Sequence, residues 1–297
     1  MKPKLIVVEG TNASGKSGLG VELALRYGGE IVSADSRQVF RGLDLGSGKI
    51  TPEEMRGVPH HLIDVVEPND FFSMRDFQRL AYEAIDGILA RGRVPFLVGG
   101  TGLYVASVVE GYELSDTPPD LAYREELEKR KTPELYRMLC ELRPDVEVDP
   151  KNRNRVMRML EKIHDGDEHA APNRPRYDCL KLGVTWDRAT LRSRIDERLK
   201  RRLDQGMVDE VRRLMEDGAT PEFLMKLGLE YRFIARYLMG EAGGYQQMVD
   251  GLATAIKQFA KRQTTWFRRD PEILWLDMAG DPVAQASAAI DRFLQGR

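Results

Sequence analysis

The segment Gly10, Thr11, Asn12, Ala13, Ser14, Gly15, Lys16 and Ser17 constrains the fold more than any other part of the chain. It fits the pattern G-x-x-x-x-G-K-[S/T] and lies between an apolar run, Lys4 to Val8, and an amphipathic stretch, Lys16 to Tyr27. The glycines let backbone amides converge on phosphate oxygens, where the N-terminus of the following helix favours negative charge. We therefore predict a phosphate site at residues 10–17, with Lys16 supplying positive charge and the Ser17 hydroxyl ligating Mg²⁺.

Further apolar runs alternate with helical patterns along the chain. We expect strands at Glu30 to Ala34, Leu62 to Val66 and Val94 to Val98, a helix at Ser73 to Ala90, and late strands at Leu180 to Trp186 and Ile273 to Leu276. Parallel neighbours need a crossover connection, so this alternation predicts an α/β fold: a P-loop-type parallel sheet flanked by helices.

The middle of the chain has a different pattern. Asp116 to His164 is helical in period but interrupted by prolines, and polar Gly166 to Asp178 reads as a returning loop. Arg188 to Phe267 is again helical, and it is basic. We expect a P-loop catalytic core from residues 1–113 and 179–297, with a basic, helical C-terminal part, and a helical insertion at 114–178.

Composition narrows the class of protein. With 297 residues, 42% hydrophobic and 31% charged, the chain is typical of a well-cored globular protein. No apolar run approaches the ~20 residues that cross a bilayer, and no signal-peptide pattern opens the chain, so we expect a cytoplasmic protein that is not bound to a membrane. Cys140 and Cys179 are too few for a disulfide framework.

Asp35 and Thr101 follow two of the expected strands. Because the carboxyl ends of parallel strands meet at one edge of the sheet, both side chains should face the phosphate site. Kinases and ATPases usually hold Mg²⁺ with an Asp at the end of a second strand, whereas Val94 to Val98 ends in Gly99 and Gly100. If the bound group is a departing pyrophosphate, Asp35 can take a proton from the nucleophile. The alternative for both residues is helix N-capping.

Three blocks resemble the tRNA dimethylallyltransferase family. They are residues 33–46, SADSRQVFRGLDLG, residues 99–104, GGTGLY, and residues 257–268, KQFAKRQTTWFR. They occur in family order and, with the P-loop, span nearly the whole chain. The resemblance implies that the exocyclic amine of the adenosine 3′ of the tRNA anticodon attacks dimethylallyl pyrophosphate and that pyrophosphate departs with Mg²⁺.

The resemblance also assigns roles to residues. Asp35 becomes the general base, Thr101 binds the pyrophosphate side, and Arg198 reaches the departing phosphates, the alternative for Arg198 being a solvated charge. Contacts with the tRNA anticodon stem-loop are expected from the helical insertion at 114–178, from a set beside the base and from the late basic helix. The residues of the last two groups are Ser36, Arg37, Gln38, Lys257, Lys261 and Arg262. We expect Trp266 and Phe267 to belong to the core, and the chain to act as a monomer.

The charge distribution is compatible with an RNA partner. Net charge is −2, but residues 188–213 carry nine basic side chains against five acidic ones, and residues 257–269 carry five basic side chains and no acidic one. Solvated helix faces would give the same pattern.

The chain departs from the family pattern at several positions: Thr11 and Asn12 follow the first Gly where the family has Pro, Phe40 replaces a common Tyr, and residues 46–50 read GSGKI. The insertion matches least well. Three alternatives stay open: a prenyltransferase acting on free adenine nucleotide, a P-loop kinase or ATPase, and a non-catalytic RNA-binding protein.

Overall fold

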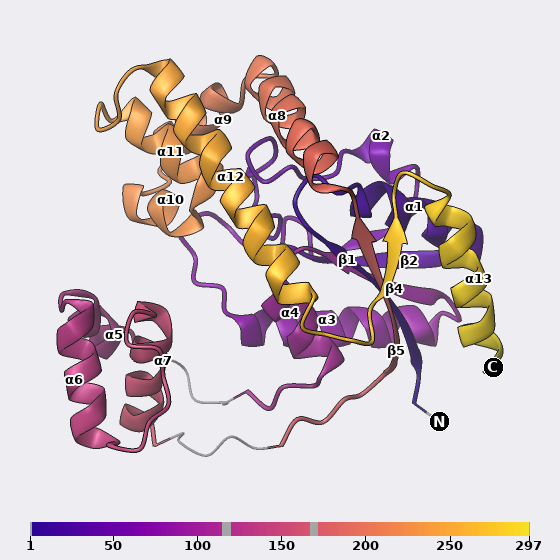
Figure 1. Cartoon of the computed structure of the whole chain (residues 1–297), viewed down its shortest axis with the longest axis horizontal. Coiled ribbons are helices and arrows are strands. Elements are labelled where there is room, and N and C mark those ends of the chain that lie inside the picture. The colour runs from indigo at the N-terminus through magenta and orange to yellow at the C-terminus, as the bar shows by residue number, and fades with distance from the viewer. Residues whose placement is uncertain (1, 115–119, 167–171, 297) are drawn as a thin grey trace. The chain divides into compact units, whose positions relative to one another are not determined.

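The computed structural model describes residues 2–114, 120–166 and 172–296. The chain divides into two units, residues 1–111 with 175–297, and residues 112–174. The first unit contains a six-stranded sheet in which all neighbours run parallel, in the order β3-β2-β4-β1-β5-β6 (Figure 1). The strands are β1 (Lys4–Gly10), β2 (Gly29–Ala34), β3 (His60–His61), β4 (Val94–Gly99), β5 (Asp178–Thr185) and β6 (Leu274–Asp277).

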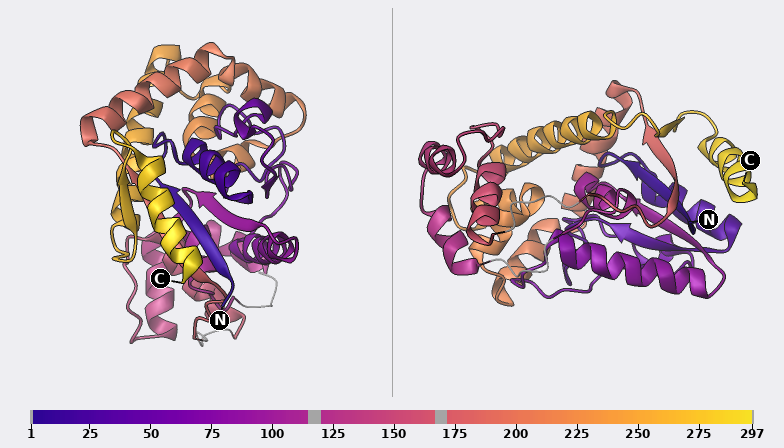
Figure 2. Two further views of the ribbon diagram at one scale, coloured as in Figure 1. Left: turned by 90° about the vertical axis from the view of Figure 1, so that its right-hand side faces the viewer. Right: turned by 90° about the horizontal axis from the view of Figure 1, so that it is seen from below.

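Helices cover both faces of this sheet. Alternate residues of β1 face opposite sides: Leu5 and Val7 belong to one apolar cluster, and Ile6 and Val8 to another. The first cluster is completed by α3 (Met74–Ala90) and α4 (Gly102–Val109), and the second by α1 (Lys16–Tyr27) and α13 (Pro282–Gln295). Figure 2 shows α3 and α13 on opposite sides of the sheet. The predicted α/β fold with a parallel, doubly wound sheet is confirmed.

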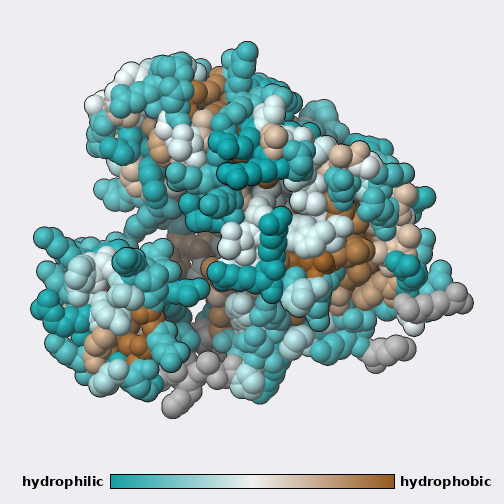
Figure 3. All heavy atoms as spheres, in the orientation of Figure 1, coloured by the Kyte–Doolittle hydropathy of each residue, from teal (hydrophilic) through white to brown (hydrophobic). Residues whose placement is uncertain are grey.

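A further helical layer stands over the carboxyl side of the sheet. It contains α8 (Arg188–Asp204), α9 (Met207–Glu216), α10 (Pro221–Leu227), α11 (Leu229–Leu238) and α12 (Tyr245–Phe267). Its core joins Tyr231, Ile234 and Leu252 to Ala13 of the P-loop and to Leu43, and the face of this layer seen in Figure 3 is mostly hydrophilic. The layer therefore packs directly on the loops that follow β1 and β2.

The second unit is a small helical body with its own core. Its helices α5 (Leu121–Glu128), α6 (Thr132–Leu142) and α7 (Arg153–His164) bury Leu127, Leu139 and Leu160 against one another. Pro133 lies in the first turn of α6, where proline is tolerated because that amide has no helical partner. Parts of the expected segments 116–164 and 166–178, namely residues 116–119 and 167–171, lie outside the described residues.

The expected strand at Leu62 to Val66 is wrong. Only His60 and His61 pair with β2, and the strand stops because Leu62 and Asp64 have φ values of 63° and 56°, in the left-handed region. Val66 makes a single bridge to Phe40. A short helix, α2 (Pro52–Met55), precedes β3. Among the described residues, no helix is long and apolar enough to span a membrane.

Candidate functional site

The P-loop forms the turn between β1 and α1 that its sequence predicts. Ala13 and Gly15 adopt φ values of 63° and 92°, and Gly15 is the N-cap of α1. The Lys16 ammonium curls back over the loop and donates to the Thr11 carbonyl oxygen at 3.4 Å. Gly10 is required by close packing, because a Cβ there would lie 2.6 Å from Val184 of β5. The loop thus presents the amino end of a helix and a lysine to the same space.

Two buried polar atoms of this loop have no partner among the described residues: Nδ2 of Asn12 and Oγ of Ser14. Buried polar groups in native proteins are nearly always hydrogen-bonded, since an unpaired one costs about 1–3 kcal/mol. Both atoms belong to the segment that the motif assigns to phosphate. Their unused hydrogen bonds indicate that the loop is shaped for a polar ligand.

Three side chains from distant segments hold the loop in place. The Gln263 side chain of α12 accepts from the Asn12 amide at 2.9 Å and donates to the Gly100 carbonyl at 2.8 Å. Trp186 donates to the Ser14 carbonyl at 2.9 Å, and Arg194 donates to the Ala13 carbonyl at 3.1 Å. These contacts could not be predicted from the sequence, since only Gln263 lies in one of the three motif blocks and none of the three residues adjoins the loop in the chain.

Asp35 and Thr101 lie at the carboxyl ends of β2 and β4, as expected. Neither side chain caps a helix. No helix begins directly after Asp35, whose Oδ1 accepts a hydrogen bond from the Arg37 amide at 3.0 Å. Thr101 occupies the N-cap position of α4, but its side chain makes no capping hydrogen bond. Oγ1 of Thr101 instead accepts from the Ser36 amide at 3.1 Å. It therefore joins the two strand ends and makes no hydrogen bond to the P-loop among the described residues.

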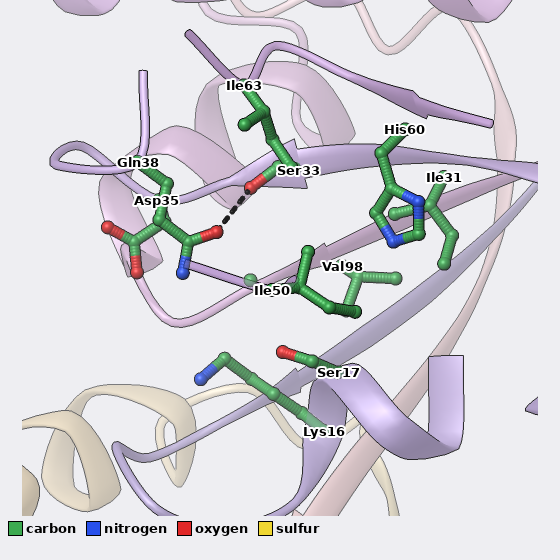
Figure 4. A pocket seen from close by; sticks show the side chains of 11 residues that line it. Lys16, Ser17, Ile31, Ser33, Asp35, Gln38, Ile50, His60, Ile63 and Val98 are labelled. Atoms are coloured by element: carbon green, nitrogen blue, oxygen red, sulfur yellow. Dashed lines mark hydrogen bonds between the residues drawn. The ribbon is translucent and has the colours of Figure 1, made fainter. Parts of the chain in front are cut away.

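A pocket opens between the P-loop and β2, and we call it the donor pocket (Figure 4). Its polar side chains are Lys16, Ser17, Ser33, Asp35 and Gln38. Its apolar side chains are Ile31, Ile50, Ile63 and Val98, and His60 and Gly99 complete it. Figure 4 shows Lys16 and Asp35 on one side of the pocket, and Ile50 and Val98 between them and His60. The pocket is therefore polar next to the phosphate loop and apolar beyond it.

Positive charge is concentrated around this site. Arg37, Arg198 and Arg202 all act electrostatically on Lys16, while Asp35 and Glu230 are the acids that act on Arg198. Buried Glu230 binds Arg37 at 2.6 Å and lies 3.8 Å from Arg202. Four cations thus face two carboxylates, which leaves net positive charge for an anionic ligand.

Burial changes the ionisation of these cations. Removal from water lowers the pKa of Lys16 to about 8; Asp35 opposes this shift, and Arg198 adds to it. Removal from water, and then neighbouring Arg202, also lower the pKa of partly buried Arg198, although a guanidinium stays protonated at neutral pH. Arg198 is only partly exposed and makes no hydrogen bond or ion pair to any described residue, so its N–H groups are available to a ligand.

The residues expected to bind tRNA lie in two places. Ser36, Arg37 and Gln38 adjoin Asp35, but Arg37 is tied to Glu230, and Gln38 donates to the Gly48 carbonyl at 3.2 Å and accepts from Ser33 at 3.4 Å. The other group lies along α12 and does not line the donor pocket. There Lys257 pairs with Asp196 at 2.6 Å, and Lys261 and Arg262 are exposed.

The two aromatic residues that follow on α12 are packed rather than displayed. Phe267 is buried, and Trp266 lies against Gly102, whose Cβ position would be 2.2 Å from the indole nitrogen.

No cluster of three or more His, Cys, Asp or Glu side chains among the described residues could hold a metal ion by itself. Mg²⁺ bound with phosphates typically takes only one or two protein ligands and completes its shell with phosphate oxygens and water. Ser17, on the wall of the donor pocket beside Lys16, fits that requirement.

A phosphate loop, a pocket that is polar next to this loop and mainly apolar beyond it, and a carboxylate beside the loop are typical of a P-loop enzyme of the group-transfer class. Comparison with known proteins gives the family. Residues 38–270 match the IPP transferase family model. The chain is 46% identical over 294 residues to tRNA dimethylallyltransferase 2 of Shewanella sediminis, covering 95% of this chain and 96% of the relative. It is also 46% identical to tRNA dimethylallyltransferase 1 of Geotalea daltonii, covering 95% and 93%.

Solved structures agree with this result. The tRNA isopentenylpyrophosphate transferase of Bacillus halodurans superposes with a TM-score of 0.75 at 38% identity, covering 99% of this chain and 96% of that one. A eukaryotic dimethylallyltransferase solved acting on tRNA shares the fold, with a TM-score of 0.80 at 24% identity. The chain belongs to the tRNA dimethylallyltransferase family, which confirms the resemblance drawn from its motifs.

Proposed function

We propose that the protein transfers the dimethylallyl group from dimethylallyl pyrophosphate to the exocyclic amine of the adenosine 3′ of the anticodon in tRNA, and releases pyrophosphate. The observation that carries this proposal is the donor pocket. A nucleoside triphosphate would place a polar sugar and base beyond its phosphates, whereas much of the wall beyond this P-loop is aliphatic and comes from Ile31, Ile50, Ile63 and Val98. A short branched hydrocarbon attached to a pyrophosphate matches the chemical character of both parts of the pocket.

The pyrophosphate end is held by the P-loop. The unpaired atoms of Asn12 and Ser14, the amino end of α1, and the Lys16 and Arg198 side chains offer donors and positive charge. As the bond between the allylic carbon and oxygen breaks, negative charge grows on the departing pyrophosphate, and fixed positive groups stabilise that charge most in the transition state. Thr101, whose Oγ1 is held by the Ser36 amide after the end of β4, is expected to bind the pyrophosphate side.

Asp35 is the general base of the proposed reaction. An adenine amine is a weak nucleophile because its lone pair is delocalised into the ring, so attack is assisted by a group that takes its proton. Asp35 lines the donor pocket beside Lys16, and only its Oδ1 is engaged, with the Arg37 amide. Oδ2 accepts no hydrogen bond among the described residues and is available for the proton.

Mg²⁺ fits the site through the Ser17 hydroxyl and the pyrophosphate oxygens, where it would neutralise charge on the leaving group.

The acceptor RNA approaches from the side of Ser36 and Arg37. Lys261, Arg262 and the helical insertion contact the sugar-phosphate backbone of the RNA. We expect the protein to act as a monomer. A base stacked in a loop is turned out to reach a catalytic pocket. A kinase or ATPase would usually have an acid at the end of a second strand, whereas β4 ends at Gly99 and is followed by Gly100. A non-catalytic RNA-binding protein would have no use for the unpaired P-loop atoms.

One assay tests this function. The protein is incubated with bulk unmodified tRNA, dimethylallyl pyrophosphate and Mg²⁺, and the digested RNA is analysed by mass spectrometry. We expect prenylated adenosine from the position 3′ of the anticodon. Transfer to free AMP alone, or rapid ATP hydrolysis that does not require tRNA, would contradict the proposal.

A further inference from the structure

His60 is the one polar group at the far end of the donor pocket. It lies on the short edge strand β3, and Figure 4 shows its ring next to Ile31, across the pocket from Lys16 and Asp35. The proposed reaction gives it no task, since the bond that breaks lies at the opposite end. A hydrocarbon group alone would be better served by another aliphatic wall, because a polar atom facing hydrocarbon loses its hydrogen bonds to water.

The protonation of this ring follows from its contacts. Nδ1 lies 2.8 Å from the Val58 carbonyl oxygen, which can only accept, so Nδ1 carries the proton. Burial, the largest influence, lowers the pKa of His60 below its ordinary value, so the ring is neutral at physiological pH. Nε2 is then a bare acceptor. It receives no hydrogen bond from any described residue.

The neighbouring histidine behaves differently. Successive side chains of a strand point to opposite faces, and His61 turns away from the pocket to bind Glu30 at 2.8 Å. His61 therefore provides a matched control on the same strand.

We propose that Nε2 of His60 accepts a hydrogen bond from a hydroxyl group at the far end of the prenyl donor, so that the protein takes a hydroxylated five-carbon allylic pyrophosphate as well as the plain one. The inference rests on the proposed function and extends its range of donors. The transfer step is the same for both donors. The allylic carbon leaves the pyrophosphate oxygen and bonds to the adenine nitrogen, whose proton passes to Asp35, and the hydroxyl is carried over unchanged.

The apolar wall around Nε2 of His60 is the physical reason why the pocket would distinguish a donor with a correctly placed hydroxyl from one without it. A hydroxyl pressed against Ile31, Ile50 and Val98 without a partner would lose its hydrogen bonds to water, whereas one that reaches Nε2 replaces them. A site that offers a hydroxyl its partner separates substrates with and without that group much better than a plain hydrocarbon wall does.

Binding measurements test the inference whether or not transfer follows. Calorimetry gives the Kd of dimethylallyl pyrophosphate and of its 4-hydroxy derivative for the wild type, His60→Leu, His60→Gln and His61→Leu. Leu matches the volume of His without an acceptor, and Gln restores one. For the wild type we expect the hydroxylated donor to bind at least as tightly as the plain one. His60→Leu should weaken its relative affinity by about tenfold or more. His60→Gln should largely keep the wild-type ratio, and His61→Leu should not change it.

Two results would overturn the inference: a wild type that binds the hydroxylated donor more than about tenfold more weakly than the plain one, or a ratio that is the same in His60→Leu and wild type. Neither result depends on transfer to tRNA. Failure of the proposed function would instead show as donor binding without prenylated RNA, so the two claims are tested separately.

Discussion

Burial sets the charge of Lys16, and this has a measurable consequence. The pKa of Lys16 in the free protein is lowered to about 8, so its ammonium is largely charged at pH 7 and largely neutral at pH 9. Donor affinity should therefore be steady near pH 7 and fall above pH 8, by at most about tenfold per pH unit, with binding accompanied by proton uptake. Calorimetry in buffers of different ionisation enthalpy measures both effects. Lys16→Gln should bind the donor weakly at every pH; a similar fall above pH 8 in this variant would contradict the assignment.

Glu9 of β1 is a second residue whose environment controls its charge. Burial, and then Asp270, raise the pKa of Glu9 to about 8, while Lys181 opposes the shift. Because the folded state holds this proton up to higher pH than the unfolded state does, folding stability should fall as pH rises from about 4.5 to 8. Glu9→Gln replaces the titrating carboxyl group with an amide that does not titrate, so this part of the pH dependence is absent from the variant. The difference in unfolding free energy between variant and wild type should grow by up to about 1.4 kcal/mol per pH unit in that range. Parallel curves from urea unfolding would contradict it.

Secondary-structure elements with strong local signals were predictable. The helix at Lys16–Tyr27 has the expected bounds, and β2 and β4 extend theirs by one residue. The β3 prediction was wrong because apolar character at 62–66 arises from single residues buried in a loop, where Leu62 is in the left-handed region. Helix α13 was missed, although Asp281 caps it and Pro282 occupies its first turn. Local signals of this kind show where a helix or strand begins in the chain, but they do not show on which face of the sheet it packs.

Glu210 of α9 fastens the loop after β2 to the helical layer. It accepts hydrogen bonds from the amides of Leu45 and Gly46, at 2.6 and 3.0 Å, and from the Tyr231 hydroxyl at 3.1 Å. Glu210→Ala leaves two buried donors and one partly buried donor unpaired, and should cost about 3 kcal/mol of unfolding free energy. Urea unfolding measures this, with exposed Glu216→Ala on the same helix as the control. A loss below about 1 kcal/mol would show that the loop is held by packing alone.

At the scale of the whole molecule, the site is assembled from both ends of the chain. The motifs placed Lys16, Asp35 and Thr101 near one another because parallel strands end at a common edge. The bracing of the P-loop by Trp186, Arg194 and Gln263 depends on tertiary contacts across most of the chain, which spacing does not encode. The functional role of each site residue stays a prediction.

The exposed basic residues of α12 provide a test at the same scale. Lys261→Gln with Arg262→Gln should weaken tRNA binding at low salt and reduce the slope of log affinity against log salt by about 1–2, because fewer counterions are released. Donor binding should be unchanged. Arg93→Gln with Arg292→Gln is the matched control, because both residues are exposed and lie at the opposite edge of the sheet from the P-loop, where the strands begin. Arg93 directly precedes β4. Arg292 lies near the end of α13, which Lys4 at the start of β1 contacts. An equal change in both double variants would mean that RNA does not follow α12.

The most direct test of the mechanism is the single-turnover rate of Asp35→Asn with saturating donor and tRNA. Asn keeps the shape of Asp and can still accept from the Arg37 amide, but it cannot take the proton of the adenine amine. Loss of a general base should lower the rate of prenyl transfer by about 10²- to 10⁴-fold, while the Kd values of donor and tRNA change far less. A rate close to that of the wild type would contradict the account and limit Asp35 to shaping the turn after β2.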